Sequence, residues 1–153
     1  MVNACRKQLD YASAAAERAG IMYEQRRGTA EALPLESSSV DCIVCTLVLC
    51  SVRDPGAALA EVSRVLKPGG RFVFVEHVAA GVDQPVLAIG QRLLDPLQSL
   101  LADGCHLTRD TGALLEEAAS AGRFSHLALD KFNLASPMAS LISPHIAGEA
   151  RVA

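Results

Sequence analysis

The sequence predicts an α/β domain whose sheet is parallel in its centre. Segments with a helical repeat alternate with short apolar segments along the 153-residue chain, and short loops connect them. Val40–Cys45 is a continuous apolar run, and Arg71–Glu76 is apolar on both alternating faces, which is typical of buried parallel strands. Half of the residues are hydrophobic, which suffices for one core, so we assign residues 1–153 to a single domain.

Four helices are predicted around these strands. The first has small or apolar residues at helical spacing, and Gly20 follows it as a C-terminal cap. The second opens at Asp54-Pro55, the third covers Val86–Leu101, and the fourth is capped by Thr108 and ended by Gly122. The positions that define the first helix are Cys5, Leu9, Ala12, Ala16 and Ala19.

Three further segments are candidate strands, namely Ile21–Arg26, Phe124–Phe132 and His145–Val152. The last two follow each other without an intervening helix. We therefore expect them to pair in antiparallel fashion at one edge of the sheet.

Charge and hydropathy exclude some classes of partner. The net charge is −3 and no basic run stands out, so no nucleic-acid partner is predicted. No apolar run reaches the length of a membrane span, and Met1–Asp10 lacks the apolar core of a signal peptide. The default expectation is a cytoplasmic protein, and the sequence does not indicate an oligomeric state.

The chain contains five cysteines, of which Cys42 and Cys45 form a C-x-x-C motif. This motif can indicate redox or metal chemistry. Here it falls within a strand, where positions three apart face opposite sides of the sheet. One metal ion or one disulfide could not easily engage both, so we interpret the thiols as structural and predict no metal site.

Several motifs, in order, resemble a known family. Gly28–Pro34 reads G-T-A-E-A-L-P, Ser39–Asp41 reads S-V-D, and Arg64–Gly70 reads R-V-L-K-P-G-G before a strand. This set resembles class I methyltransferases that depend on S-adenosylmethionine, of the type 11 kind.

Four other segments are similar to a narrower group, the methyltransferase-like 7 or thiol methyltransferase group. They are Cys45–Val52, Glu76–Ala79, Leu94–Pro96 and Asp103–Arg109. The last reads D-G-C-H-L-T-R, which is not general to methyltransferases. Relatives in this group carry an N-terminal membrane anchor, whereas no such segment is evident in these 153 residues.

The resemblance implies a Rossmann-like sheet of strand order 3-2-1-4-5-7-6 with helices on both faces. On that pattern Ile21–Arg26 is strand 3, Val40–Cys45 strand 4 and Arg71–Glu76 strand 5. Strands 1 and 2 of the pattern are lacking, and no G-x-G-x-G motif precedes Gly28. Ligands of such sheets bind at the switch point between strands 1 and 4, so only one wall of that cleft is expected here.

The resemblance also implies a cofactor, S-adenosylmethionine, and residues near it. The loop after strand 3 meets the adenine in this family, and the end of strand 4 meets the methionine part. A surface loop and core packing are the alternatives for these two segments. The cofactor-binding residues carried over in this way are Thr29, Ala30, Glu31, Cys45, Thr46 and Leu47.

Candidates for the chemistry follow strand 5 and the third helix. His77 and Asp103 are candidate general bases, although His77 could be a satisfied polar residue and Asp103 could belong to a helix-capping network. Cys105, His106 and Arg109 are candidates for the acceptor pocket by similarity to the thiol-methylating group.

The functional prediction is a transferase that moves a methyl group from S-adenosylmethionine to a small-molecule acceptor, with a thiol as the candidate acceptor. The alternative is a non-catalytic, truncated remnant of such an enzyme that binds a partner or has no function. An oxidoreductase with a nucleotide cofactor is disfavoured, because its glycine fingerprint is missing.

Overall fold

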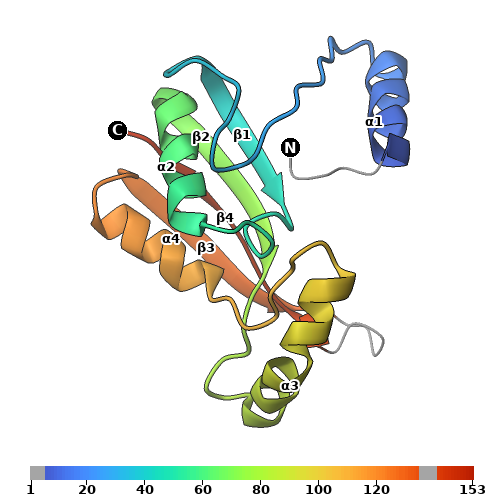
Figure 1. The fold of residues 1–153 in the computed structure, drawn as a ribbon. Coiled ribbons are helices and arrows are strands. Elements are labelled where there is room, and N and C mark those ends of the chain that lie inside the picture. Colours follow the sequence, from blue (N-terminus) through green and yellow to red (C-terminus); the bar gives the residue numbers. More distant parts are fainter. Residues whose placement is uncertain (1–5, 135–140) are drawn as a thin grey trace.

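The computed structural model describes residues 6–134 and 141–153, which form four helices and one sheet (Figure 1). Cys5, assigned above to the first helix face, lies outside the described residues. The elements in chain order are α1 (Arg6–Arg18), β1 (Val40–Thr46), α2 (Pro55–Val65), β2 (Leu66–His77), α3 (Pro85–Leu101), α4 (Thr111–Ser120), β3 (His126–Asn133) and β4 (Pro144–Arg151).

The sheet of the described chain has the strand order β1-β2-β4-β3. β1 and β2 are parallel, with Cys45 opposite Phe74 and Thr46 opposite Val75. β4 is antiparallel to both β2 and β3, which confirms the antiparallel pair expected at the edge. This order corresponds to strands 4-5-7-6 of the class I methyltransferase pattern.

Helix α2 joins the two parallel strands. The Asp54 carboxylate accepts a hydrogen bond from the Ala57 N–H at 2.9 Å, and Pro55 occupies the first turn, as expected of a helix start. The helix ends at Val65 and β2 begins at the next residue. The strand pairing then skips Lys67–Gly70, so this Lys-Pro-Gly-Gly segment is an irregularity inside β2.

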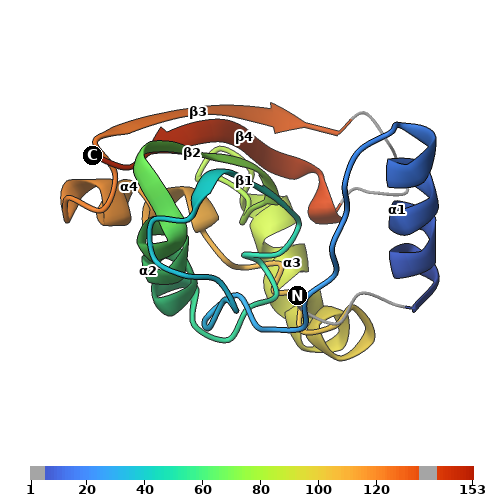
Figure 2. The same ribbon diagram turned by 90° about the horizontal axis from the view of Figure 1, so that it is seen from above.

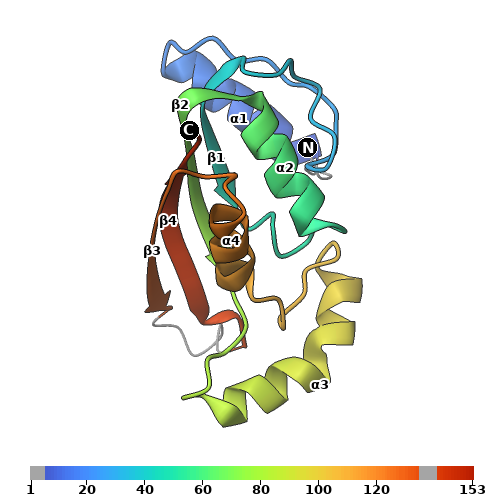
Figure 3. The ribbon, with the colours of Figure 1, turned by 90° about the vertical axis from the view of Figure 1, so that its left-hand side faces the viewer.

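The core lies on one face of the sheet, where α2 and α4 pack (Figures 2 and 3). Phe72 and Phe74 of β2 are fully buried there, and the ring of Phe124 stacks on that of Phe72 at 6.3 Å. On the opposite face the side chain of Val44 is 72% exposed. Helical cover was expected on both faces, and among the described residues α2 and α4 supply it on one.

The strand predicted over Ile21–Arg26 is wrong. The segment has no strand structure, and Met22 is fully exposed. The physical reason is that a strand needs a hydrogen-bonded neighbour. In the class I pattern strand 3 lies beside strand 2, and the sheet of the described chain contains no such partner. Gly20 does end α1 as expected, with a φ of 66°.

Two details of the later helices differ from expectation or add to it. Asp110, and not Thr108, caps α4, because its carboxylate accepts the Ala113 N–H at 3.0 Å. Helix α3 extends away from the sheet (Figure 3), and several apolar side chains along it are exposed, including Val86 and Leu100.

Among the described residues, none of the helices combines the length and the hydropathy needed to cross a bilayer.

Candidate functional site

Three segments converge where β1 and β2 end. They are the loop that follows β1, the last residues of β2, and the loop between α3 and α4. The His106 N–H donates to the Cys50 carbonyl at 3.0 Å, and the Ala79 N–H donates to the Arg109 carbonyl at 3.0 Å. These backbone bonds hold the three segments together at the edge where ligands of α/β sheets bind.

The carboxylate of Glu76 organises the loop after β1. Glu76 is completely buried, and one of its oxygens accepts the Val48 N–H at 2.9 Å and the Cys45 thiol at 3.3 Å. Its second oxygen accepts the Cys50 N–H at 3.3 Å. Burial raises the pKa of Cys45, and the neighbouring carboxylate raises it further, so this thiol is a donor and remains protonated.

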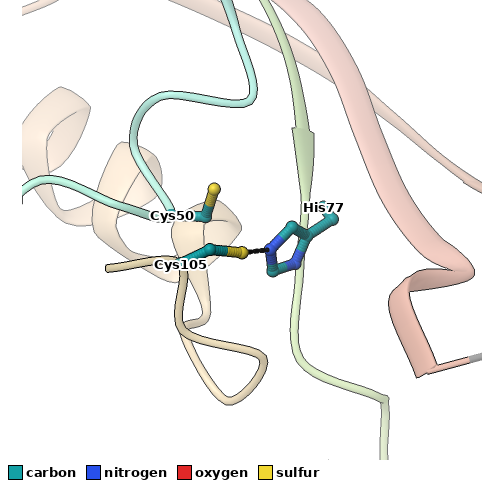
Figure 4. Close-up of side chains that lie close together, drawn as sticks. All are labelled: Cys50, His77 and Cys105. Carbon is teal, nitrogen blue, oxygen red and sulfur yellow. Dashed lines mark hydrogen bonds between the residues drawn. The ribbon is translucent and has the colours of Figure 1, made fainter. Parts of the chain in front are cut away.

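The convergence places three soft side chains together, those of Cys50, His77 and Cys105 (Figure 4). Their sulfur and nitrogen atoms all lie within 4.8 Å of one another, and all three residues are buried. His77 Nε2 is 2.8 Å from Cys105 Sγ. His77 Nδ1 has no hydrogen-bond partner among the described residues. The candidate base and one candidate of the acceptor pocket are therefore in direct contact.

The two thiols of this group have very different acidities. A hydrogen bond from Cys50 is the largest influence on Cys105 and lowers its pKa; burial opposes this effect, and contact with His77 lowers the pKa further. The same hydrogen bond, together with burial, raises the pKa of Cys50. The arrangement therefore makes Cys105 the more acidic of the two thiols.

Arg109 was expected in the acceptor pocket, and the structure places its guanidinium against the protein's own backbone. Nη1 donates to the carbonyl oxygens of Leu49 and Val52, both at 2.7 Å. Arg109 is only partly buried, but both bonds reach the loop that carries Cys50. This geometry makes Arg109 a residue that positions the loop.

His106 and Asp103 take no part in the Cys50–His77–Cys105 group. His106 Nδ1 is 3.1 Å from Asp95 Oδ2, and the other Asp95 oxygen accepts the Thr108 N–H at 3.1 Å. Burial raises the pKa of Asp95, but these hydrogen bonds outweigh burial and hold the pKa below its usual range. Asp103 is exposed and has a φ of 49°, so its backbone makes the tight turn before Cys105.

The Thr29–Glu31 loop lies on the same edge of the sheet as the loop after β1. The Glu31 carboxylate accepts the N–H groups of Arg53 and Asp54 at 2.9 and 3.4 Å, just before α2 begins. Burial raises the pKa of Glu31, but its hydrogen bonds to backbone N–H groups and to Thr29 hold it below its usual value. Ala30 packs against the core, and Thr29 is exposed.

The end of β1 supplies the remaining candidates. Cys45 points to Glu76, as described above, whereas the side chains of Thr46 and Leu47 are exposed. Leu47 has a φ of 54°, and its N–H donates to Val75 at 2.9 Å. The left-handed backbone at Leu47 turns the chain off the strand and leaves the Leu47 side chain 47% exposed on the edge.

These residues fit part of a site for a nucleoside sulfonium. Thr29 and Thr46 present exposed hydroxyls, which can donate and accept hydrogen bonds, and Leu47 adds an apolar surface. The carboxylate of Glu31 is already engaged with backbone groups. Glu31 therefore shapes the loop, and the Thr29 hydroxyl, which also bonds to Glu31, is the exposed polar group of this segment.

Fold and sequence together define the class of protein. The methyltransferase domain family matches residues 1–74. The solved structure of YcgJ from Bacillus subtilis superposes with a TM-score of 0.67 at 21% identity, covering 98% of this chain and 80% of that one. A second solved structure, BH2331 from Bacillus halodurans, gives a TM-score of 0.71 at 18% identity, covering 96% of this chain and 79% of that one. The chain thus has the Rossmann-like class I fold and is similar in sequence to methyltransferases.

Within that class, the chain is similar to thiol S-methyltransferases. It is 48% identical to TMT1A of Homo sapiens over 113 residues, which are 73% of this chain and 43% of that protein. It is 45% identical to TMT1B of Rattus norvegicus over 117 residues, which are 76% of this chain and 45% of that protein. The chain thus spans less than half the length of these curated relatives.

One member of the site, Cys50, was missed by sequence reasoning. The two cysteines and His77 are separated by more than 25 residues in each case, so no short metal or redox motif marks them. The available signal was topological: each residue lies at or after the end of a strand or helix that leads to the same edge of the sheet.

Proposed function

We propose that this chain is part of an S-adenosylmethionine-dependent methyltransferase that methylates a small thiol. The observation that carries the proposal is the parallel β1–β2 pair, whose carboxyl ends bring Thr46, Leu47 and His77 to one edge. Similarity to the thiol S-methyltransferases over about three quarters of the chain supports the choice of acceptor.

The proposed cofactor site uses the exposed parts of this edge. Thr29 and Ala30 meet the adenine, Thr46 and Leu47 meet the methionine portion, and Glu31 and Cys45 act through the loops that they hold. S-adenosylmethionine supplies an activated methyl group on a sulfonium. The protein's contribution is to hold acceptor and methyl carbon in line and to exclude water.

The proposed acceptor site lies beside His77 and Cys105, with Arg109 holding the loop between them and His106 paired to Asp95. A thiol with a pKa of about 8.5 is already partly ionised near neutral pH, so a weak base suffices. Asp103 is exposed on the turn before Cys105, and His77 Nε2 is engaged with Cys105. Of the two base candidates, His77 is therefore the one in contact with a residue of the proposed acceptor site.

Two measurements on the purified chain test this function. Calorimetric titration with S-adenosylmethionine is expected to give saturable binding. Incubation with cofactor labelled in the methyl group is expected to label a simple alkanethiol, and not the alcohol and amine of the same carbon skeleton.

No heat and no labelled product at millimolar cofactor would support the alternative of a non-catalytic remnant. That alternative is considered because the chain covers only 43% of the length of TMT1A. Equal labelling of the alcohol and the thiol would leave a methyltransferase but contradict the proposed acceptor.

A further inference from the structure

The Cys50–His77–Cys105 group has the composition of a metal site. The three residues come from three separate segments of the fold, and they are 1%, 3% and 8% exposed (Figure 4). Two sulfurs and one imidazole nitrogen lie within 4.8 Å of one another, and all three belong to buried residues. Thiolate and imidazole ligands select zinc and similar soft or borderline ions.

The spacing of the ligand atoms suits tetrahedral coordination after a small adjustment. Zinc–sulfur bonds of about 2.3 Å and zinc–nitrogen bonds of about 2.0 Å place tetrahedral ligand atoms roughly 3.5–3.8 Å apart. The observed limit of 4.8 Å includes that range. The contact of 2.8 Å between His77 Nε2 and Cys105 Sγ would have to lengthen by roughly 0.7 Å, which a small side-chain rotation provides.

The surrounding backbone holds the ligands in place before any ion binds. The Cys50 carbonyl accepts the His106 N–H at 3.0 Å, so the two cysteine-bearing loops are joined beside the ligands. Glu76 accepts the Cys50 N–H, and Arg109 binds the carbonyls on either side of Cys50. A metal site on supported loops needs little rearrangement to bind.

We propose that Cys50, His77 and Cys105 bind one zinc ion, and that the fourth coordination position takes the sulfur of the thiol acceptor. Three protein ligands and one open position are the pattern of catalytic zinc sites. The zinc site stands on the geometry alone, whereas its use by the acceptor rests on the proposed function.

The chemistry of the proposed step balances without a redox partner. With His77 acting as a zinc ligand and not as a base, the acceptor thiol loses its proton to solvent as its sulfur binds the zinc ion. That sulfur then forms a bond to the methyl carbon, the bond between this carbon and the sulfonium breaks, and the electron pair stays on the departing S-adenosylhomocysteine. The thioether product, which is a weaker ligand than a thiolate, leaves the metal.

Metal content tests the site independently of activity. The chain is loaded with zinc, dialysed against metal-free buffer and analysed by mass spectrometry of the element. We expect one equivalent in the unchanged chain and in Cys42→Ser, and none in Cys50→Ser, His77→Gln or Cys105→Ser. Cys42 is the matched control because it is an exposed thiol outside the group.

Cobalt titration gives a second readout. The expected signal is a sulfur-to-cobalt absorption band with the intense visible bands of tetrahedral cobalt, saturating at one equivalent and absent in Cys50→Ser. Circular dichroism of each variant checks that the fold survives. An unchanged chain that retains no zinc, or ligand variants that retain as much as Cys42→Ser, would overturn the zinc site.

Chelation tests the role of the zinc ion in acceptor binding separately from the methyltransferase activity itself. Thiol methylation that persists after a chelator has removed all zinc would overturn the role of the ion and leave the methyltransferase standing. Zinc binding without any thiol methylation would leave the site standing and contradict its use by an acceptor. Loss of thiol labelling on chelation and its return on adding zinc is the expected result.

Discussion

The buried carboxylate of Glu76 accepts a hydrogen bond from the backbone N–H of Val48 at 2.9 Å and so joins the end of β2 to the loop after β1. Three donors share this carboxylate, and its side chain is closed off from solvent. Both the exposed edge at Leu47 and the buried group around Cys50 depend on the course of this loop. Replacing Glu76 should therefore perturb both parts of the candidate site.

Glu76→Gln is expected to lower the free energy of unfolding by about 1–3 kcal/mol, because one buried oxygen becomes an amide that meets donors. Urea unfolding followed by circular dichroism measures the loss. Glu24→Gln is the control, since Glu24 pairs with Arg26 on the surface and such pairs contribute little. Equal losses in the two variants would show that the buried network does not hold the loop.

Arg109→Lys is expected to loosen the loop without abolishing the fold, because one ammonium cannot reproduce the paired bonds to Leu49 and Val52. Faster hydrogen exchange should be confined to the amides of residues 50–52. Arg92→Lys, on the exposed side of α3, is the control. Unchanged exchange together with weaker acceptor binding would instead support a direct contact between Arg109 and the acceptor.

The ionised carboxylate of Glu61 should make a pH-dependent contribution to the stability of the fold. Hydrogen bonds from Arg64 lower the pKa of Glu61 to about 2; burial opposes them, and the Leu33 N–H adds to them. The folded pKa lies below the unfolded value of 4.5, so this stabilisation is present above about pH 4.5 and is lost as the pH falls toward about 2.

Glu61→Gln tests that dependence. The variant should be less stable than the unchanged chain by about 1 kcal/mol near neutral pH, and the difference should shrink in acid. Urea unfolding of both proteins at a series of pH values measures it. A difference that grows in acid would contradict the assigned sign.

Gly148→Ala is expected to disrupt the middle of the sheet. Gly148 lies in β4 between Phe74 and Leu129, and an added Cβ would meet the Ala128 carbonyl, Phe74 Cζ at 2.8 Å and Leu129 Cα at 2.9 Å. Overpacking of this kind costs about 1–3 kcal/mol. A lower thermal midpoint is the expected measurement.

Gly112→Ala should act in the opposite direction. Gly112 lies in the first turn of α4, and its nearest neighbour would be Asp110 Oδ1 at an ordinary 3.4 Å. Replacing a helical glycine by alanine stabilises by roughly 0.5–1 kcal/mol. Destabilisation by both variants would argue that Gly148 is not a special position.

The predicted parts of the fold are those that local pattern determines. The apolar run at Val40–Cys45 and the alternation at Arg71–Glu76 reveal buried strands, and their parallel pairing follows from the helix between them. Ile21–Arg26 begins with three apolar residues but has no partner strand in the described sheet, and a segment's own residues do not reveal whether a partner is present. Thr108 and Asp110 are both good capping residues, so sequence alone could not choose between them.

The candidate site was predictable as an edge of the sheet, and less so as a set of contacts. The motif around Cys105 and the strand end at His77 were recognised, yet their contact depends on a loop closure that no spacing rule describes. Arg109 was expected to face a ligand, and it binds carbonyl oxygens instead. The sequence shows that a side chain is charged, but the tertiary structure determines which group it binds.

The outer side of β1 has a consequence for handling the protein. Among the described residues β1 bonds only to β2, so its other row of amide and carbonyl groups is available to any extended peptide. The exposed side chain of Val44 adds an apolar surface beside this strand edge. A short synthetic strand supplied in solution should therefore dock there, whereas concentrated stocks without it should form edge-to-edge aggregates.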